Sequence, residues 1–278
     1  MSTHDSGGWV RRFDPSDSVM HACLMISFLG VSLTGLPLLF SSAPWAAGIV
    51  AAFGGFQVAG TFHRMFALLM IGTFTAHLGK ICYGVFVVKD YGILYGPRSM
   101  VPHPKDLSDM VGHLKWFLGL GKRPAFDRFT YWEKFDYWAV FWGMAVIGGS
   151  GLMLWFPSFF SRIVPGWVFN VALIVHGEEA LMATTFIFTV HFFNGHIRPE
   201  KFPMDTVIFT GRMPKEELRL ERPSEWARVQ EEGGMSAIEA PAPERELLLF
   251  GKTIGTIGVV LGLTLAALCI YALAFAHH

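Results

Sequence analysis

Five long apolar stretches constrain this chain more than any other feature of its sequence. Polar segments separate them, and they run over 19–40, 65–88, 137–160, 167–193 and 253–276. Each is long enough to cross the ~30 Å hydrocarbon core of a bilayer, which takes about 20 helical residues. Because backbone polar groups must be satisfied internally in lipid, such stretches form a helical bundle. The sequence therefore predicts an all-α membrane protein.

Composition supports the same class, since 52% of residues are hydrophobic and only 16% are charged, whereas soluble domains have about 25% charged residues. A further apolar stretch over 43–60 is rich in Gly and Ala, and we interpret it as an interfacial or re-entrant segment. The three cysteines have no metal-ligand or disulfide spacing, and no CxxCH motif for covalent haem attachment occurs.

The basic residues predict the orientation, because cytoplasmic segments near membrane spans carry the excess of Lys and Arg. With the amino terminus inside, only Arg64 and Arg162 of the 22 basic residues lie outside. We therefore expect a bacterial inner-membrane protein with a cytoplasmic N-terminus and a periplasmic C-terminus. The basic residues follow topology instead of forming one binding face, so we expect contact with lipid and no nucleic-acid partner.

The polar segments divide the chain into four predicted parts. Residues 1–18 form a cytoplasmic start, with the first helix beginning near Pro15; 19–197 form a four-helix bundle that includes the cytoplasmic loop 90–134; 198–248 form a partly extended cytoplasmic connection; and 249–278 hold a fifth helix. In the loop, 106–120 has helical spacing of apolar residues, which predicts either a helix on the membrane surface or one packed on its own protein. These residues are Leu107, Met110, Val111, Leu114, Phe117 and Leu118.

Histidines in the second and fourth stretches are the main functional candidates, because polar groups inside a membrane span are costly. His63 and His77 are fourteen residues apart, so on an α-helix they share a face within ~40° and lie ~21 Å apart along the axis. His176 and His191 are fifteen residues apart, ~60° off register and ~22 Å apart. We therefore expect His63 to face His176 near the outer surface, and His77 to face His191 near the inner one.

Two facing imidazoles at each depth predict two b-type haems, because low-spin haem iron takes two axial histidines from facing helices. The alternative is that these histidines only form hydrogen bonds between helices. Small residues in two of the stretches have two explanations: they leave room for a flat macrocycle to approach the backbone, or they allow two helices to pack closely. They are Gly30 and Gly35 in the first stretch and Gly143, Gly148, Gly149 and Gly151 in the third.

Several segments resemble known cytochrome b subunits. The second stretch, with His63, Arg64, His77 and Lys80, resembles the second helix of cytochrome b from quinol-oxidising bc-type complexes, and the fifteen-residue step of the fourth is similar to the plastid and cyanobacterial form. DSVMHACLMISFLGVSLTGL resembles the opening helix of the cytochrome b subunits of formate dehydrogenase and nickel-iron hydrogenase. YWEKFDYWAVFWGMAVIGGSGLMLWF and HGEEALMATTFIFTVHFFNGHIRPEKFPMD resemble bacterial subunits that work with multihaem c-type or iron-sulfur partners.

The resemblances agree on His63 and His176 as outer haem ligands and differ at the inner haem. The bc-type pattern implies His77 with His191, which we favour, whereas the dehydrogenase pattern implies His21 with His191. His196 and the other inner-side histidines, His103 and His113, are expected to be surface or interface residues.

Quinone chemistry moves protons with electrons, so a quinone site needs titratable groups near a haem. Glu179 follows His176 by three residues and points within ~60° of its direction, so we expect it to carry protons at an outer quinol site; the alternative is a carboxylate stabilised by the helix amino terminus. The predicted function is electron transfer between quinone and a redox partner, as a subunit of a respiratory oxidoreductase complex. The alternatives are a non-redox anchor or proton or metal transporter, and a stand-alone transmembrane reductase.

Overall fold

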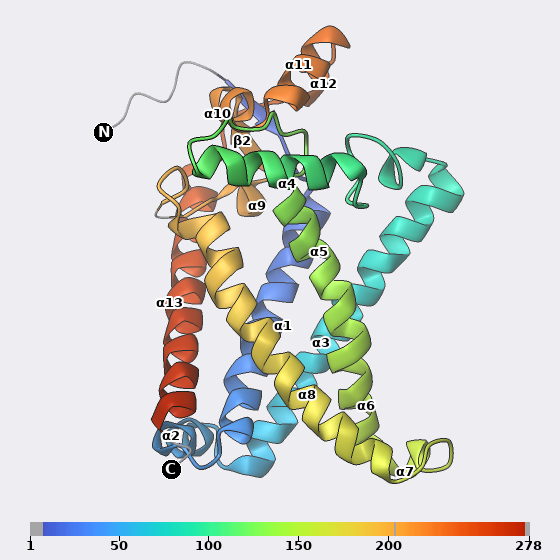
Figure 1. Ribbon diagram of the computed structural model, residues 1–278, viewed down its shortest axis with the longest axis vertical. Helices are drawn as coiled ribbons and strands as arrows, with labels where there is room; N and C mark the ends of the chain where they lie inside the picture. Colours follow the sequence, from blue (N-terminus) through green and yellow to red (C-terminus); the bar gives the residue numbers. More distant parts are fainter. Residues whose placement is uncertain (1–7, 203, 276–278) are drawn as a thin grey trace. The chain divides into compact units, whose positions relative to one another are not determined.

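The chain is an all-α, multi-pass membrane protein. The computed structural model describes residues 8–202 and 204–275, and within them five helices are long and apolar enough to span a membrane (Figure 1). The first is α1 (Pro15–Leu39), and the second joins α3 (Phe56–Cys82) to the π-helix η1 (Tyr83–Val88). The third joins α5 (Tyr131–Gly143), the π-helix η3 (Met144–Gly148) and α6 (Gly149–Trp155). The fourth joins α8 (Trp167–Phe186) to the π-helices η4 (Ile187–His191) and η5 (Phe193–Ile197), and the fifth is α13 (Arg245–Phe275).

The spans match the predicted ones with shifted ends. The first helix begins at Pro15, as predicted. The third span ends at Trp155 and not at Phe160, because Pro157 has no backbone N–H to continue the helix and starts the separate helix α7 (Pro157–Phe160). The second span begins nine residues early, at Phe56, and the fifth eight residues early, at Arg245. Residues 1–7 and 276–278, which the sequence assigns to the N-terminal segment and the last span, lie outside the described residues.

The apolar stretch 43–60 does not form a spanning helix. It contains α2 (Pro44–Ala52), whose nine residues reach only ~14 Å. The chain then turns through Gly54 and Gly55, both with positive φ, before α3 begins. Glycine suits this turn because other residues rarely adopt positive φ.

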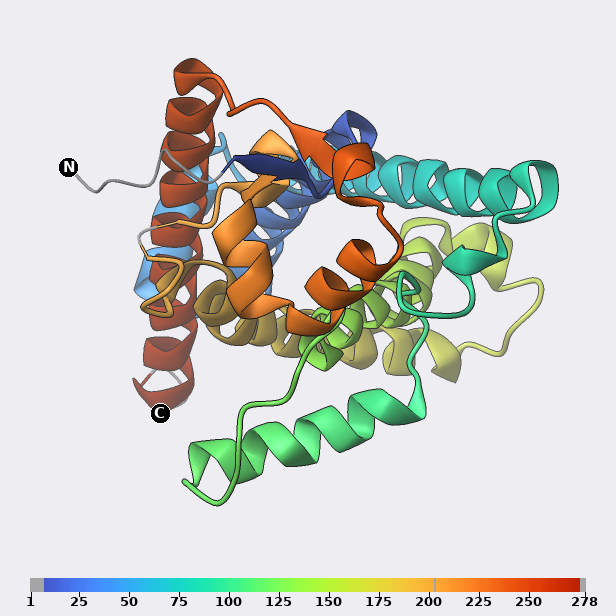
Figure 2. The ribbon, with the colours of Figure 1, turned by 90° about the horizontal axis from the view of Figure 1, so that it is seen from above.

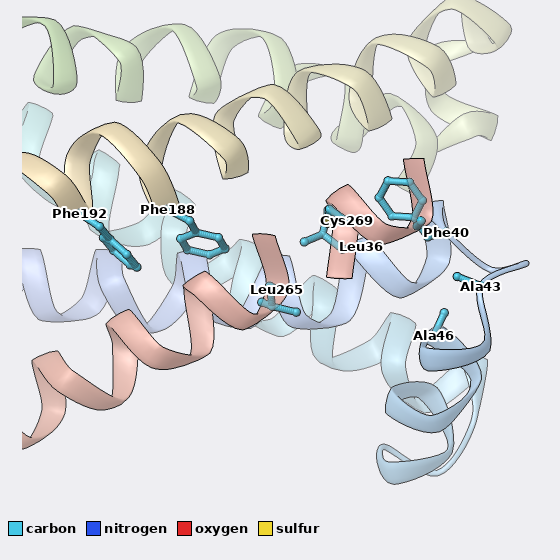
Figure 3. Close-up of a cluster of buried hydrophobic side chains, with 9 residues drawn as sticks. Leu36, Phe40, Ala43, Ala46, Phe188, Phe192, Leu265 and Cys269 are labelled. Carbon is cyan, nitrogen blue, oxygen red and sulfur yellow. The ribbon is translucent and has the colours of Figure 1, made fainter. Parts of the chain in front are cut away.

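The chain separates into two compact units, and most of the membrane-spanning part belongs to unit 2 (19–75, 139–205 and 250–278). Its core gathers buried side chains from α1, α2, the fourth span and α13, shown in Figure 3: Leu36, Phe40, Ala43, Ala46, Phe188, Phe192, Leu265, Cys269 and Ala272. Gly262 of α13 permits close packing here, because a Cβ at that position would lie 2.6 Å from both Phe188 and Phe192.

Unit 1 (1–18, 76–138 and 206–249) brings together segments that the sequence separates. Strand β1 (Trp9–Arg11) pairs antiparallel with β2 (Arg212–Pro214) and with β3 (Glu239–Ala240). The connection predicted as partly extended therefore holds strands and also four short helices. These are α9 (Val207–Thr210), α10 (Lys215–Glu221), α11 (Pro223–Glu231) and α12 (Met235–Ile238).

A buried ion-pair network joins the three segments of unit 1. Arg12 contacts Glu225 at 2.5 Å, with both side chains almost fully buried, and Arg128 contacts the other oxygen of Glu225 at 3.1 Å. Arg12 and Arg128 also donate to each other's backbone carbonyl oxygens. Burial lowers the pKa of Arg12 to about 10, against the opposing effect of Glu225, so Arg12 remains charged at neutral pH. The Glu225 carboxylate therefore compensates the charge of Arg12, which would be costly to bury alone.

The loop between the second and third spans contains the short 3₁₀ helix η2 (Tyr91–Ile93) and the predicted amphipathic helix, α4 (Pro104–Phe117). The side chain of His103 caps α4 by accepting from the Lys105 N–H, and Asp106 accepts from the His103 N–H. This reciprocal pair explains why the helix begins at Pro104. His113 is buried among aromatic rings, so the expectation of a surface or interface residue is wrong for it.

Candidate functional site

The rings of His63 and His176 face each other inside unit 2. His63 lies on α3 and His176 on α8, and their ring centroids are 6.2 Å apart with the ring planes at 80°. Both side chains are partly buried. The pairing of these two residues across the second and fourth spans is the arrangement that their sequence positions predict.

A hydroxyl group and a glycine of α1 hold the ring of His63. The Thr34 Oγ1 lies 3.1 Å from His63 Nδ1, and the same hydroxyl donates its hydrogen to the Gly30 carbonyl at 2.7 Å. Because that hydrogen is used, Oγ1 accepts from Nδ1–H of His63. The ring edge lies against Gly35, where a Cβ would be 2.9 Å from His63 Cε1.

The third span holds the ring of His176 in the same way. His176 Nδ1 lies 3.0 Å from the Ile147 carbonyl oxygen, which can only accept, so Nδ1 carries the proton. The Ser150 hydroxyl is 3.4 Å from the same nitrogen and donates to the Val146 carbonyl. A Cβ at Gly151 would lie 2.9 Å from His176 Cε1.

The residues that hold the ring of His63 and those that hold the ring of His176 follow the same short sequence pattern, which sequence reasoning missed. A β-branched residue is followed three positions later by a hydroxyl residue and then by glycine: Val31, Thr34 and Gly35 in the first span, and Ile147, Ser150 and Gly151 in the third. The signal was present as a repeat with the same spacing in two spans, each preceding a histidine-bearing span. Only the two glycines were predicted to matter.

These hydrogen bonds determine which nitrogen of each ring carries the proton and which is left to bind a metal. With the proton on Nδ1 of each ring, each Nε2 keeps a lone pair that can bind a metal. Two imidazoles that bind one metal from opposite sides at about 2 Å have ring centres roughly 6 Å apart. The donor set therefore fits a metal with two axial imidazoles, as in bis-histidine haem, with the ligands oriented through Nδ1.

The donor set fits other metal centres less well. Among the described residues no group of three or more His, Cys, Asp or Glu side chains is arranged to hold a metal ion. Structural and catalytic zinc sites use three or four protein ligands. Two protein ligands are enough only when the remaining positions come from a bound group such as a porphyrin.

The other small residues differ in what surrounds them. Gly30 serves close packing, because a Cβ there would lie 2.3 Å from the Phe66 ring. By contrast, a Cβ at Gly149 would meet nothing within 4 Å. Gly143 and Gly148 would meet only side chains of their own span, Ile147 and Met144.

A second group of histidines lies near the end of the fourth span in unit 2. The rings of His191 and His196 have centroids 6.4 Å apart, and His21 of α1 is within electrostatic range of both. His191 ends the π-helix η4 and His196 lies in η5. A π-helix turns less per residue than an α-helix, so the angle predicted between His176 and His191 from α-helical geometry does not hold. The wider turn of a π-helix also places residues that are five apart, such as His191 and His196, on the same side of the helix.

The structure places His77 in unit 1, with its Nε2 2.9 Å from the Tyr137 hydroxyl oxygen. Close by, Lys80 forms an ion pair with Asp17 and donates to the Ser16 hydroxyl at 2.9 Å. His21 and His191 therefore share a unit, whereas the predicted pairing of His77 with His191 stays a prediction.

Glu179 points toward the third span, because its Oε2 accepts a hydrogen bond from the Trp142 indole N–H at 3.2 Å. Its neighbour Glu178 is exposed, whereas Glu179 is half-buried. The structure therefore distinguishes the two carboxylates, and the orientation of Glu179 toward a haem stays a prediction.

No protein-family model and no curated protein matches the chain.

Proposed function

We propose that this protein is a membrane cytochrome b subunit that binds two b-type haems and transfers electrons between a quinone and a redox partner subunit. One observation carries the proposal: His63 and His176 face each other at 6.2 Å, each with its proton fixed on Nδ1. When bound, haem would supply reversible one-electron transfer. The residues of the chain would bind it, orient both ligands and exclude water.

For the second haem we propose His191 as one axial ligand. Its proximity to His21 within unit 2 supports His21 as the partner, the alternative implied by the dehydrogenase-type resemblance. The hydrogen bond between His77 and Tyr137 supports a different role for His77. The proposed orientation, with the N-terminus in the cytoplasm of a bacterial inner membrane, rests on the distribution of basic residues.

At the outer haem we propose that Glu179 carries protons for quinol oxidation. The bond from Trp142 directs its carboxylate toward the third span. A carboxylate held in this way is available to accept a proton from a bound quinol, as general-base catalysis requires.

Haem content of single variants tests the ligand assignment. We expect His63→Ala and His176→Ala each to lose the same single haem and to retain the other. His21→Ala is expected to lose the second haem, whereas His77→Ala is expected to keep both. Unchanged stoichiometry in His63→Ala and His176→Ala would remove the basis of the proposal, and loss of a haem in His77→Ala would restore the bc-type assignment.

A further inference from the structure

Helix α4 presents its apolar side outward. Its large apolar residues fall on one stripe of the helix, and each exposes between 43% and 68% of its surface: Leu107, Met110, Val111, Leu114 and Phe117, followed just after the helix by Leu118. On a soluble protein such a stripe is the side that packs on the core.

The opposite side of α4 packs on its own unit. His113 is buried, and a Cβ at Gly112 would lie 3.1 Å from Pro124. Lys105 donates to the Ala125 carbonyl and pairs with Asp109 at 2.6 Å. The polar and small residues of α4, together with Trp116, therefore contact protein, while the residues of the stripe stay largely exposed. The helix therefore packs on its own unit through one side, while the stripe lies on the other, exposed side.

Two contacts tie α4 to the first turn of the third span. His113 Nδ1 lies 3.1 Å from the Tyr131 hydroxyl oxygen, and Asp106 pairs with the partly buried Lys134 at 2.9 Å. Figure 1 shows α4 crossing the start of α5, and in Figure 2 α4 lies at the margin of unit 1. The first turn of a spanning helix lies at the boundary between lipid and water, so α4 is held at that boundary.

We propose that α4 lies in the membrane interface, with its apolar stripe inserted among the lipid acyl chains. The occupant of this face is lipid because the attachment to Tyr131 and Lys134 fixes the helix at the bilayer surface, where acyl chains adjoin it. Insertion depends on apolar area more than on charge, since the two acidic residues of α4 are paired with Lys134 and Lys105. This inference does not depend on haem binding.

Spin labels on the two sides of α4 test the proposal. Cys23 and Cys82 are replaced by Ala, whereas the buried Cys269 is retained because a label does not reach it. One label is placed through Leu114→Cys, and the matched control through Ser108→Cys, an exposed position outside the stripe. The purified full chain is placed in phospholipid vesicles, and collision rates with oxygen and with a water-soluble nickel chelate are measured.

We expect the label at position 114 to collide more with oxygen and less with the nickel chelate than the label at 108. Equal exposure of both labels to the chelate would show a solvated helix and overturn the proposal. A label at 114 that is immobile and shielded from both reagents would show a protein partner, which also overturns it. A second pair, Leu107→Cys with Lys115→Cys, gives the same comparison if either first variant fails to fold.

Discussion

The Thr34 hydroxyl oxygen lies 3.1 Å from His63 Nδ1, and the Val31 backbone carbonyl also accepts a hydrogen bond from His63. His176 is held in the same way, with the Ile147 carbonyl oxygen 3.0 Å and the Ser150 hydroxyl oxygen 3.4 Å from its Nδ1. An Nδ1–H bond raises the basicity of an imidazole ligand. We therefore predict that Thr34→Val raises the reduction potential of one haem, because a weaker donor stabilises oxidised iron less.

A redox titration followed by absorbance measures this effect. Thr34→Ser keeps the hydroxyl and should retain the original potential. Ser150→Ala should produce a smaller shift, because the Ser150 hydroxyl lies 3.4 Å from His176 Nδ1, farther than the 3.1 Å between Thr34 and His63. Equal potentials for the Val and Ser variants would show that the hydroxyl does not orient the ligand.

Glu179 and Glu178 form a matched pair of carboxylates, since only Glu179 bonds to Trp142. We predict that Glu179→Gln slows quinol oxidation by about 100-fold or more, the usual contribution of a positioned general base, while haem content stays unchanged. Glu178→Gln should keep the original rate. Equal rates for the two variants in a quinol-oxidation assay would exclude Glu179 as the proton carrier.

At the scale of single elements, α13 depends on small residues where it meets the fourth span. A side chain at position 262 would collide with Phe188 and Phe192. We predict that Gly262→Leu destabilises the protein by about 1–3 kcal/mol, the usual cost of overpacking. The control is Gly149→Ala, where an added methyl meets open space. Thermal unfolding in detergent measures both, and an unchanged midpoint for Gly262→Leu would show that α13 does not pack there.

The sequence predicts the spanning helices and the His63–His176 pair well, because length, apolarity and helical spacing are properties of single segments. It does not predict the π-helices around His191, since one wider turn leaves no compositional signal. The end of the third span at Trp155 was recoverable from Pro157. The roles of Thr34 and Ser150 were not, because a hydroxyl in a span also bonds to its own helix.

For the whole molecule, the sequence does not reveal that the N-terminal strand, the loop and the connection after the fourth span form one unit. These contacts join residues more than a hundred positions apart, as in the pair of Arg12 with Glu225. We predict that Glu225→Gln destabilises unit 1 by about 3–5 kcal/mol, because it leaves the buried Arg12 without its carboxylate.

Hydrogen exchange or limited proteolysis of the full chain measures that loss. Glu216→Gln is the control, since Glu216 forms only an exposed pair with Arg219, and exposed pairs contribute little to stability. Equal protection of unit 1 in the two variants would show that the buried network does not hold its segments together.

The most direct measurement is the haem content of the purified chain, from the absorbance of its pyridine haemochrome after expression in cells that make haem. The proposal predicts two b-type haems per polypeptide, with one lost on replacement of either His63 or His176. A folded chain without a Soret band would contradict it, because the facing imidazoles would then bind no porphyrin.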